Sequence, residues 1–226
     1  MCDPLEADHA ELVRAALPVC DKYGLALAGG YAMKAHGLVS RASKDIDFAT
    51  ASTAAVQEIA HDLATAYGEA GLAATVIAAQ DRKGHLLVRL PQGSEYRVDI
   101  LKEPLSGPPA IMSFGPVLSL EDAVSLKMGA LHDRGLPRDL IDVHAATMFF
   151  SNIELVSMAK RALGDDFFYE DLRDQLDHAA VYSDEEFTVY GCREDQITAI
   201  KAWAQQWADH LGRLIAQETP YSDELD

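Results

Sequence analysis

The sequence lacks the usual marks of secreted, zinc-binding and membrane-spanning proteins. Its three cysteines, Cys2, Cys20 and Cys192, are an odd number without a CxxC pair. This indicates free thiols in a reducing cytosol and argues against a zinc site. The first residues are acidic and carry no apolar secretory segment, and no apolar run approaches transmembrane length. The sequence therefore predicts a cytoplasmic protein with no membrane partner.

Several common catalytic motifs are also absent. The eight histidines show no HExxH or HxxxH spacing, which excludes the usual zinc hydrolases. There is no GxSxG, and no Walker lysine follows the one promising glycine pair, so serine hydrolases of the usual type and P-loop enzymes are excluded as well.

Positive charge is scarce. The net charge is −17, and residues 151–226 hold 6 Lys+Arg against 17 Asp+Glu, whereas residues 1–150 hold 13 against 19. Such a chain is a poor general binder of nucleic acid, because contacts to phosphate need Lys and Arg. We expect no DNA partner. An RNA acceptor would need a local basic patch, and the first 150 residues are the better place for it.

The pattern of apolar residues and turns predicts an α+β protein with a mixed β-sheet and flanking helices in residues 1–118, followed by a helical domain in residues 119–226. Half of the 226 residues are apolar (49%), enough for a real core. The expected helices in the first part are 5–22, 31–36 and 52–69, the first broken or kinked by Pro18 and the last capped by Ser52 or Thr53. The expected strands are 25–28, 44–50, 73–79, 85–90 and 96–101, and 102–115 is expected to be a loop.

Capping signals mark the later helices. Ser119 precedes a helix to about residue 133, Pro137 begins the next, and Ser151 with Glu154 forms a capping box. A long helix is expected over 193–217.

The most informative segment is Gly29-Gly30 followed by Asp45-Ile46-Asp47. Glycines between a strand and a helix let backbone N–H groups approach phosphate oxygens. In a strand, Asp45 and Asp47 point to the same face, and two adjacent carboxylates suit a divalent cation that also binds substrate phosphates. Ser43 is either a hydrogen-bond donor to phosphate or an ordinary loop serine.

A third acidic residue, Asp99, lies in a predicted strand on the opposite face from Tyr96, Val98 and Ile100. Next to the other two carboxylates it would be a metal ligand or the general base for an attacking hydroxyl. Alternatively, it faces water or pairs with Arg97.

A second cluster runs from Lys127 to Asp142. Arg138 and Asp142 are four residues apart, so they lie on one helical face and can pair. Lys127 is placed to extend toward a triphosphate. The alternative is a pair of amphipathic helices whose exposed ion pairs matter little.

Together these segments resemble the AbiEii/AbiGii-type nucleotidyltransferase toxins of the polymerase-β-like nucleotidyltransferase superfamily. The glycine pair, the run Arg41-Ala42-Ser43-Lys44-Asp45-Ile46-Asp47-Phe48 and Val98-Asp99-Ile100 carry the superfamily likeness. The segment from Lys127 through Arg138-Asp139-Leu140-Ile141-Asp142 is specific to this branch. The likeness covers about residues 24–146, and Tyr31 departs from it by replacing a hydroxyl residue after the glycines.

The resemblance implies Mg²⁺- or Mn²⁺-dependent transfer of a nucleoside monophosphate from an NTP to an acceptor hydroxyl, with release of pyrophosphate. It implies an RNA or tRNA 3′ end as acceptor and a cognate antitoxin as partner. The implied catalytic residues are Asp45, Asp47, Asp99 and Lys127; the metal ligands Asp45, Asp47 and Asp99; and the nucleotide-binding residues Gly29, Gly30, Ser43, Lys127, Arg138 and Asp142.

Two alternatives remain open. The acidity suits a small cationic acceptor such as an aminoglycoside, and a protein hydroxyl is a related possibility. An alternative of another class is a catalytically silent nucleotidyltransferase-fold binding protein, although the three strand acids argue against it.

Overall fold

The computed structural model describes residues 5–218 of the 226-residue chain. The chain divides into two compact units, residues 1–123 and residues 124–226. The division falls within helix α4 (Leu120–Arg134), whereas the sequence placed it just before this helix. Along the described residues, no helix is long and apolar enough to cross a bilayer.

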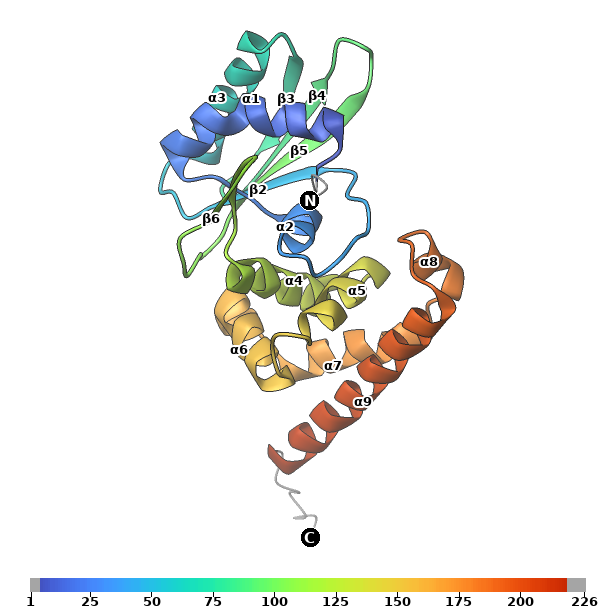
Figure 1. Cartoon of the computed structure of the whole chain (residues 1–226). Helices are drawn as coiled ribbons and strands as arrows, with labels where there is room; N and C mark the ends of the chain where they lie inside the picture. Colours follow the sequence, from blue (N-terminus) through green and yellow to red (C-terminus); the bar gives the residue numbers. More distant parts are fainter. Residues whose placement is uncertain (1–4, 219–226) are drawn as a thin grey trace. The chain divides into compact units, whose positions relative to one another are not determined.

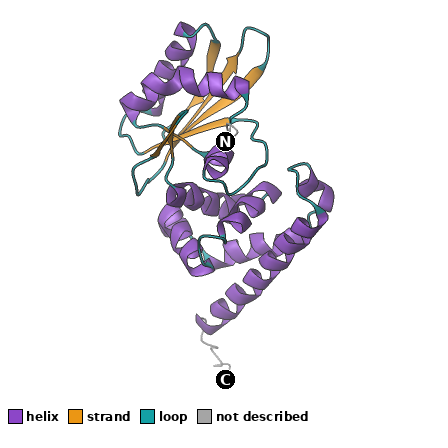
Figure 2. Cartoon of the chain, viewed as in Figure 1, coloured by secondary structure: helices purple, strands orange, loops and turns teal. Residues whose placement is uncertain are grey.

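The first unit is built on a mixed sheet of seven strands in the order β3-β4-β5-β2-β1-β7-β6 (Figures 1 and 2). Its strands are β1 (Ala26–Leu27), β2 (Ile46–Thr50), β3 (Ala73–Ala79), β4 (Lys83–Arg89), β5 (Glu95–Lys102), β6 (Ala110–Met112) and β7 (Gly115–Val117). The β2–β5 and β1–β7 pairs are parallel and the other pairs are antiparallel. The predicted mixed sheet with flanking helices is thus confirmed.

Three helices belong to this unit: α1 (Ala7–Tyr23), α2 (Gly29–Ala35) and α3 (Val56–Glu69). Helices α1 and α3 pack against each other, and α3 packs on β3, β4 and β5. The predicted apolar face of α3, formed by Val56, Ile59, Ala60 and Leu63, is fully buried. This packing covers one face of the sheet at β3–β5. Along each strand, residues that point to this face alternate with residues that point to the other face.

Several local expectations need correction. Pro18 lies inside α1 without ending it, and the helix runs to Tyr23, where Gly24 follows in the left-handed region at φ 61°. The N-cap of α3 is Ala55, without a side-chain cap bond, so neither Ser52 nor Thr53 caps it. The expected loop 102–115 contains β6 and leads directly into β7, two three-residue strands at the edge of the sheet.

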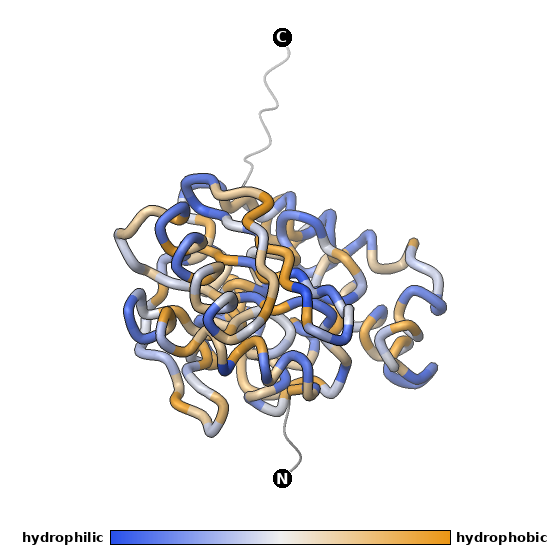
Figure 3. Tube along the Cα trace, turned by 90° about the horizontal axis from the view of Figure 1, so that it is seen from above, coloured by the Kyte–Doolittle hydropathy of each residue, from blue (hydrophilic) through white to orange (hydrophobic). Residues whose placement is uncertain are grey.

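The second unit is helical, as expected. It contains most of α4, followed by α5 (Pro137–Ala146), α6 (Asn152–Leu163), α7 (Tyr169–Asp177), α8 (Asp184–Thr188) and α9 (Glu194–Glu218), with short 3₁₀ turns at Gly164–Asp166 and His178–Ala180. Pro137 begins α5, and Ser151 with Glu154 forms the predicted capping box of α6. In Figure 3 hydrophobic and hydrophilic segments alternate along the trace, as expected for amphipathic elements with buried apolar faces.

Candidate functional site

The glycine pair begins helix α2 directly after strand β1 and lies against Asp47 of β2. The backbone N–H of Ala28 donates to the carbonyl oxygen of Asp47 at 2.7 Å, which holds the two segments together. Gly29 has φ 57°, and a Cβ atom at this position would lie only 1.9 Å from Oδ2 of Asp47. Only glycine therefore fits between the start of α2 and the Asp47 carboxylate.

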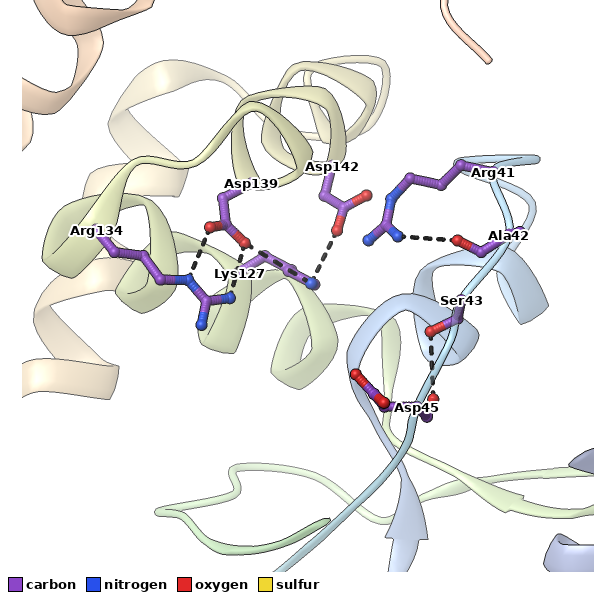
Figure 4. Close-up of polar contacts among 8 residues, drawn as sticks. All are labelled: Arg41, Ala42, Ser43, Asp45, Lys127, Arg134, Asp139 and Asp142. Atoms are coloured by element: carbon purple, nitrogen blue, oxygen red, sulfur yellow. Dashed lines mark hydrogen bonds and ion pairs between the residues drawn. The ribbon is translucent and has the colours of Figure 1, made fainter. Parts of the chain in front are cut away.

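Gly30 is equally close to the loop before β2. A Cβ on Gly30 would lie 3.0 Å from Ser43 Oγ and 3.1 Å from a guanidinium nitrogen of Arg41. The Ser43 hydroxyl donates to the backbone oxygen of Asp45 at 3.3 Å (Figure 4). Arg41 is buried, at 9% exposure. The structure thus brings together Gly29, Gly30, Ser43 and the carboxylates that follow.

The sequence predicted that Asp45 and Asp47 both lie in a strand, but only Asp47 does. Strand β2 begins at Ile46, so Asp45 lies in the bend before it, and only Asp47 alternates with the buried Ile46 and Phe48. Both acids are half-buried. Within residues 5–218, the Asp45 carboxylate accepts no hydrogen bond and joins no ion pair. The oxygen atoms of the Asp45 carboxylate can therefore bind a cation.

Asp99 lies on the strand next to Asp47, as predicted. The parallel register of β2 and β5 pairs Asp47 with Asp99 directly. Oδ1 of Asp99 accepts from Nε of Arg97 at 2.7 Å and lies 2.7 Å from Nδ1 of His85. Asp99 is therefore beside Asp47 and also pairs with Arg97, whereas its role as metal ligand or general base stays a prediction.

Arg97 is the counter-ion of this carboxylate group. Its pKa is raised above the ordinary value, mainly by the Asp99 side chain and further by the charges of Asp45 and Asp47. A single guanidinium thus stabilises negative charge that three acids contribute to one region of the sheet.

These residues fit a divalent cation bound through two carboxylates. No group of three or more His, Cys, Asp or Glu side chains among residues 5–218 is close enough to hold a metal ion. Magnesium in phosphoryl-transfer sites needs only one or two carboxylates, because substrate phosphates and water supply the other ligands. Asp45 and Asp47 are the candidates for such a pair, and at position 29 a Cβ would lie only 1.9 Å from Oδ2 of Asp47.

Lys127 is buried in the helical unit between two carboxylates (Figure 4). Its Nζ lies 2.8 Å from Asp142 and 4.0 Å from Asp139, and both acids are 0% exposed. Arg134 donates two hydrogen bonds to Asp139, at 2.9 and 3.1 Å. Asp142 therefore pairs with Lys127, and Arg138, which the sequence offered as its partner, forms no ion pair within residues 5–218.

Tyr31, the residue that departs from the family pattern, points into the core. It is 1% exposed, and its hydroxyl contacts His9 and, at 3.3 Å, the backbone oxygen of Ser43. Burial raises the pKa of the Tyr31 hydroxyl and lowers the pKa of His9. The hydroxyl therefore supports the Ser43 loop from behind.

The sequence did not predict that His85 is the neighbour of Asp99. In β4, Gly84, Leu86 and Val88 are buried, whereas His85 is half-buried and Leu87 is exposed, and a four-residue turn, 91–94, joins β4 to β5. Counting outward from that turn, where Arg89 faces Glu95, places His85 opposite Asp99.

The contact between Gly29 and Asp47 gives a direct prediction. Gly29→Ala is expected to destabilise the protein more than Gly24→Ala, because both glycines have positive φ but only Gly29 approaches another side chain. Gly24 has no atom within 4 Å of an added Cβ, so its substitution is expected to cost about 1 to 2 kcal/mol of unfolding free energy. Urea unfolding of both variants measures the difference, and equal losses would contradict the close approach.

The first unit combines a mixed sheet, a glycine turn at the start of α2, and the neighbouring carboxylates of Asp47 and Asp99. The match to the family model for the nucleotidyl transferase AbiEii toxin of type IV toxin–antitoxin systems spans residues 12–225. The chain therefore belongs to the AbiEii nucleotidyltransferase toxin family, which implies an NTP substrate and an antitoxin partner, and this family generally uses a divalent metal.

Solved structures share the fold at low sequence identity. A putative nucleotidyltransferase from Helicobacter pylori has a TM-score of 0.60 at 16% identity, covering 93% of this chain and 99% of its own. JHP933 from Helicobacter pylori has a TM-score of 0.59 at 17% identity, covering 93% and 94%. MenT4, a nucleotidyltransferase toxin from Mycobacterium tuberculosis H37Rv, has a TM-score of 0.59 at 19% identity, covering 91% and 82%. No curated protein matches the sequence.

Proposed function

We propose that this toxin transfers a nucleoside monophosphate from an NTP to the hydroxyl of an RNA 3′ end, most simply a tRNA, and releases pyrophosphate. The observation that carries the proposal is the packing of Gly29 against Asp47, with Asp45 on one side and Asp99 on the neighbouring strand. Gly29 has no side chain, so its backbone lies close to the Asp47 carboxylate. This arrangement suits a substrate that brings phosphates and a cation together.

The proposed roles follow from the contacts. Asp45 and Asp47 hold Mg²⁺ or Mn²⁺, which when bound neutralises charge on the phosphates and on the pyrophosphate leaving group. Gly29 and Gly30 admit the triphosphate, and Ser43, beside Gly30, donates to it. Asp99, whose Oδ1 is already occupied by two nitrogen atoms, is assigned to the acceptor side. Roles for Lys127, Arg138 and Asp142 in nucleotide binding stay predictions from the sequence.

The RNA acceptor is an inference from the resemblance of the sequence to these toxins, which act in toxin–antitoxin systems. The net charge of −17 favours a second candidate, a small cationic acceptor, because an acidic surface attracts cations. Both candidates share the chemistry of the site and differ only in the molecule that supplies the hydroxyl.

The test is a transfer assay with purified protein, Mg²⁺, each α-labelled NTP in turn, and total RNA. Label on a tRNA-sized band is the expected result, and the band identifies the nucleotide. Parallel reactions contain an aminoglycoside in place of RNA. Label on the small molecule alone would overturn the RNA acceptor, and no transfer to any acceptor would overturn the proposed function.

A further inference from the structure

The two edges of the sheet differ in how they are protected. Strand β6 forms one edge, is only three residues long and directly follows Pro108 and Pro109. Strand β3 forms the other edge, and its seven residues, Ala73–Ala79, include no proline and no charged side chain. Short length, proline and charge are the features that keep exposed strand edges from pairing with other chains. The β3 edge therefore lacks the protection that the β6 edge has.

The residues of β3 are largely open to solvent. Val76 is 40% exposed and Ile77 is 63% exposed, and Ala73 and Thr75 are also exposed. Among the described residues, no strand lies beyond β3 in the sheet. Exposed apolar side chains along an open strand edge are typical of a surface that pairs with another strand.

The hydrogen bonds between β4 and β5 show which way each backbone group of β4 points. At one end of this pair the N–H of Leu90 donates to the backbone oxygen of Ser94, and at the other end the N–H of Lys102 donates to the backbone oxygen of Arg82. Backbone groups of an antiparallel strand point alternately to its two neighbours. Even-numbered residues of β4 therefore face β5, and odd-numbered residues face β3.

The same alternation fixes the backbone of β3. Ala73 and Thr75 are the register partners of odd-numbered β4 residues, so their backbone groups face β4. Ala74 and Val76 consequently direct their N–H and C=O groups away from the sheet. A register shift follows between Val76 and Ala78, so the regular part of this open edge is centred on Thr75.

This part of β3 is complementary to itself. If two copies pair in antiparallel orientation with Thr75 opposite Thr75, Ala74 lies opposite Val76 and Ala73 lies opposite Ile77. Each alanine then meets a β-branched residue, and the outward N–H and C=O groups of Ala74 and Val76 bond to each other on both sides of the axis. A strand that is opposite itself in this way is joined by a two-fold axis, which closes the assembly at two copies.

Helix α3 permits the approach of a second copy on its own face of the sheet. Nε2 of Gln57 donates to the backbone oxygen of Ala79 at 3.1 Å, so this side of α3 borders β3. His61, Ala64 and Gly68 follow Gln57 at helical spacing, and none of these residues is acidic. Their side chains are small or neutral and leave room beside the strand edge.

The acidic side chains in the body of α3 point toward α1. Glu58 and Asp62 contact the Tyr23 hydroxyl at 2.8 and 2.7 Å, and Asp62 also accepts from Lys22 at 2.7 Å. Glu69 is the last residue of the helix. In a chain with a net charge of −17, two copies repel each other unless the contact surface is free of acids. The β3 edge and the adjacent side of α3 form such a surface.

We propose that two copies of this chain pair through β3, in antiparallel orientation and centred on Thr75, so that one continuous sheet runs through both. The proposal goes beyond the proposed function and does not depend on it. The two-fold axis is perpendicular to the sheet, so corresponding faces of the two copies lie on the same side. The faces that carry Asp47 and Asp99 are then together on one side of the joined sheet, and the two α3 helices are on the other.

Sedimentation velocity of the full-length chain over a range of concentrations tests the pairing. The wild-type protein is expected to form a reversible dimer. Thr75→Lys and Thr75→Asp each place two like charges opposite each other, where they repel and lose part of their hydration. We expect either substitution to raise the dimer dissociation constant at least about tenfold. Thr75→Val, which has nearly the same shape and no charge, is the matched control and is expected to dimerise like the wild type.

A mixture of the two charged variants tests the symmetry. Thr75→Lys and Thr75→Asp are expected to form a dimer together, because opposite charges then face each other across the axis. Native mass spectrometry with one variant labelled with ¹⁵N identifies this mixed dimer. Ile111→Lys places a charge on the β6 edge, where Ile111 is 80% exposed, and is expected to leave the wild-type dimer unchanged.

Hydrogen exchange followed by NMR provides a readout without any substitution. The backbone amides of Ala74 and Val76 are expected to exchange more slowly as the protein concentration rises, because they become bonded to the second copy. The amide of Thr75 faces β4 in the single chain, so its exchange is expected to change little.

Three results would each overturn the proposal: a wild-type chain that is monomeric at every concentration, a dimer that both charged variants retain, and a mixture of these variants that stays monomeric. If the wild-type chain is monomeric and binds a cognate antitoxin that Thr75→Lys no longer binds, the antitoxin occupies β3 in place of a second copy. None of these measurements uses nucleotide transfer, so failure of the proposed function leaves their outcome unaffected.

Discussion

Asp47→Asn is expected to abolish nucleotide transfer while the protein stays folded. Asn has the size of Asp, so the close approach of Gly29 is preserved, but the negative charge that we propose holds the cation is lost. A metal supplies several kcal/mol of stabilisation to the transition state, and about 1.4 kcal/mol corresponds to a factor of ten in rate. We therefore expect kcat/KM to fall by at least about 10³-fold.

Two measurements complete this experiment. Mn²⁺ titration in the absence of nucleotide is expected to show weakened metal binding in Asp47→Asn. Glu95→Gln is the control, because Glu95 lies on the same face of β5 as Asp99 but pairs with Arg89 at the far end of the strand. It removes the same charge and is expected to leave transfer unchanged. Substantial transfer by folded Asp47→Asn would refute the assignment of the site.

Asp142→Ala is expected to lower the unfolding free energy by about 3 to 5 kcal/mol. The substitution removes the carboxylate 2.8 Å from Nζ of Lys127, a lysine whose side chain is only 9% exposed. Asp139, 4.0 Å away, already accepts two hydrogen bonds from Arg134 and replaces the lost partner poorly. Urea denaturation followed by circular dichroism measures the loss.

The double variant Lys127→Met/Asp142→Leu tests why Asp142→Ala loses stability. It distinguishes the cost of leaving Lys127 as an unpaired buried charge from the cost of poor packing. Replacing both members of a buried ion pair by apolar residues is often neutral or stabilising. We expect it to recover most of the stability that Asp142→Ala loses. Arg138→Met is the surface control and is expected to change stability little, because Arg138 joins no ion pair among the described residues. If Asp142→Ala lowers the unfolding free energy by less than about 1 kcal/mol, the Lys127–Asp142 pair contributes no more than an exposed salt bridge.

Local signals in the sequence predicted much of the fold. Pro137 and Ser151 mark the starts of their helices through their own backbone and side-chain chemistry, so neighbouring residues suffice. The alternation in β5 likewise separated Asp99 from Val98 and Ile100, which are fully buried.

Errors arose where long-range packing decides the outcome. Strand β6 follows a proline, strand β7 contains a glycine, and each is only three residues long. Pairing within the sheet therefore defines these strands, and the strand propensity of their residues does not. Asp142 lies 2.8 Å from Lys127 of the preceding helix, α4, whereas spacing along one helix pointed to Arg138. The contact between His85 and Asp99 depends on the cross-strand register of β4 and β5, which becomes clear only when residues are counted outward from the turn 91–94.

The parallel pairing of β2 with β5 also bears on when the toxin first acquires its acidic centre. A growing chain that has emerged only to residue 90 contains Asp45 and Asp47, but the strand that places Asp99 beside them has not yet been made. Between the two strands lie α3, β3 and β4, so the pairing closes a long loop and requires non-local contacts that form slowly. The centre is therefore assembled by folding across the whole α/β unit, and a truncated product that ends before β5 lacks the pairing that places Asp99 beside Asp47.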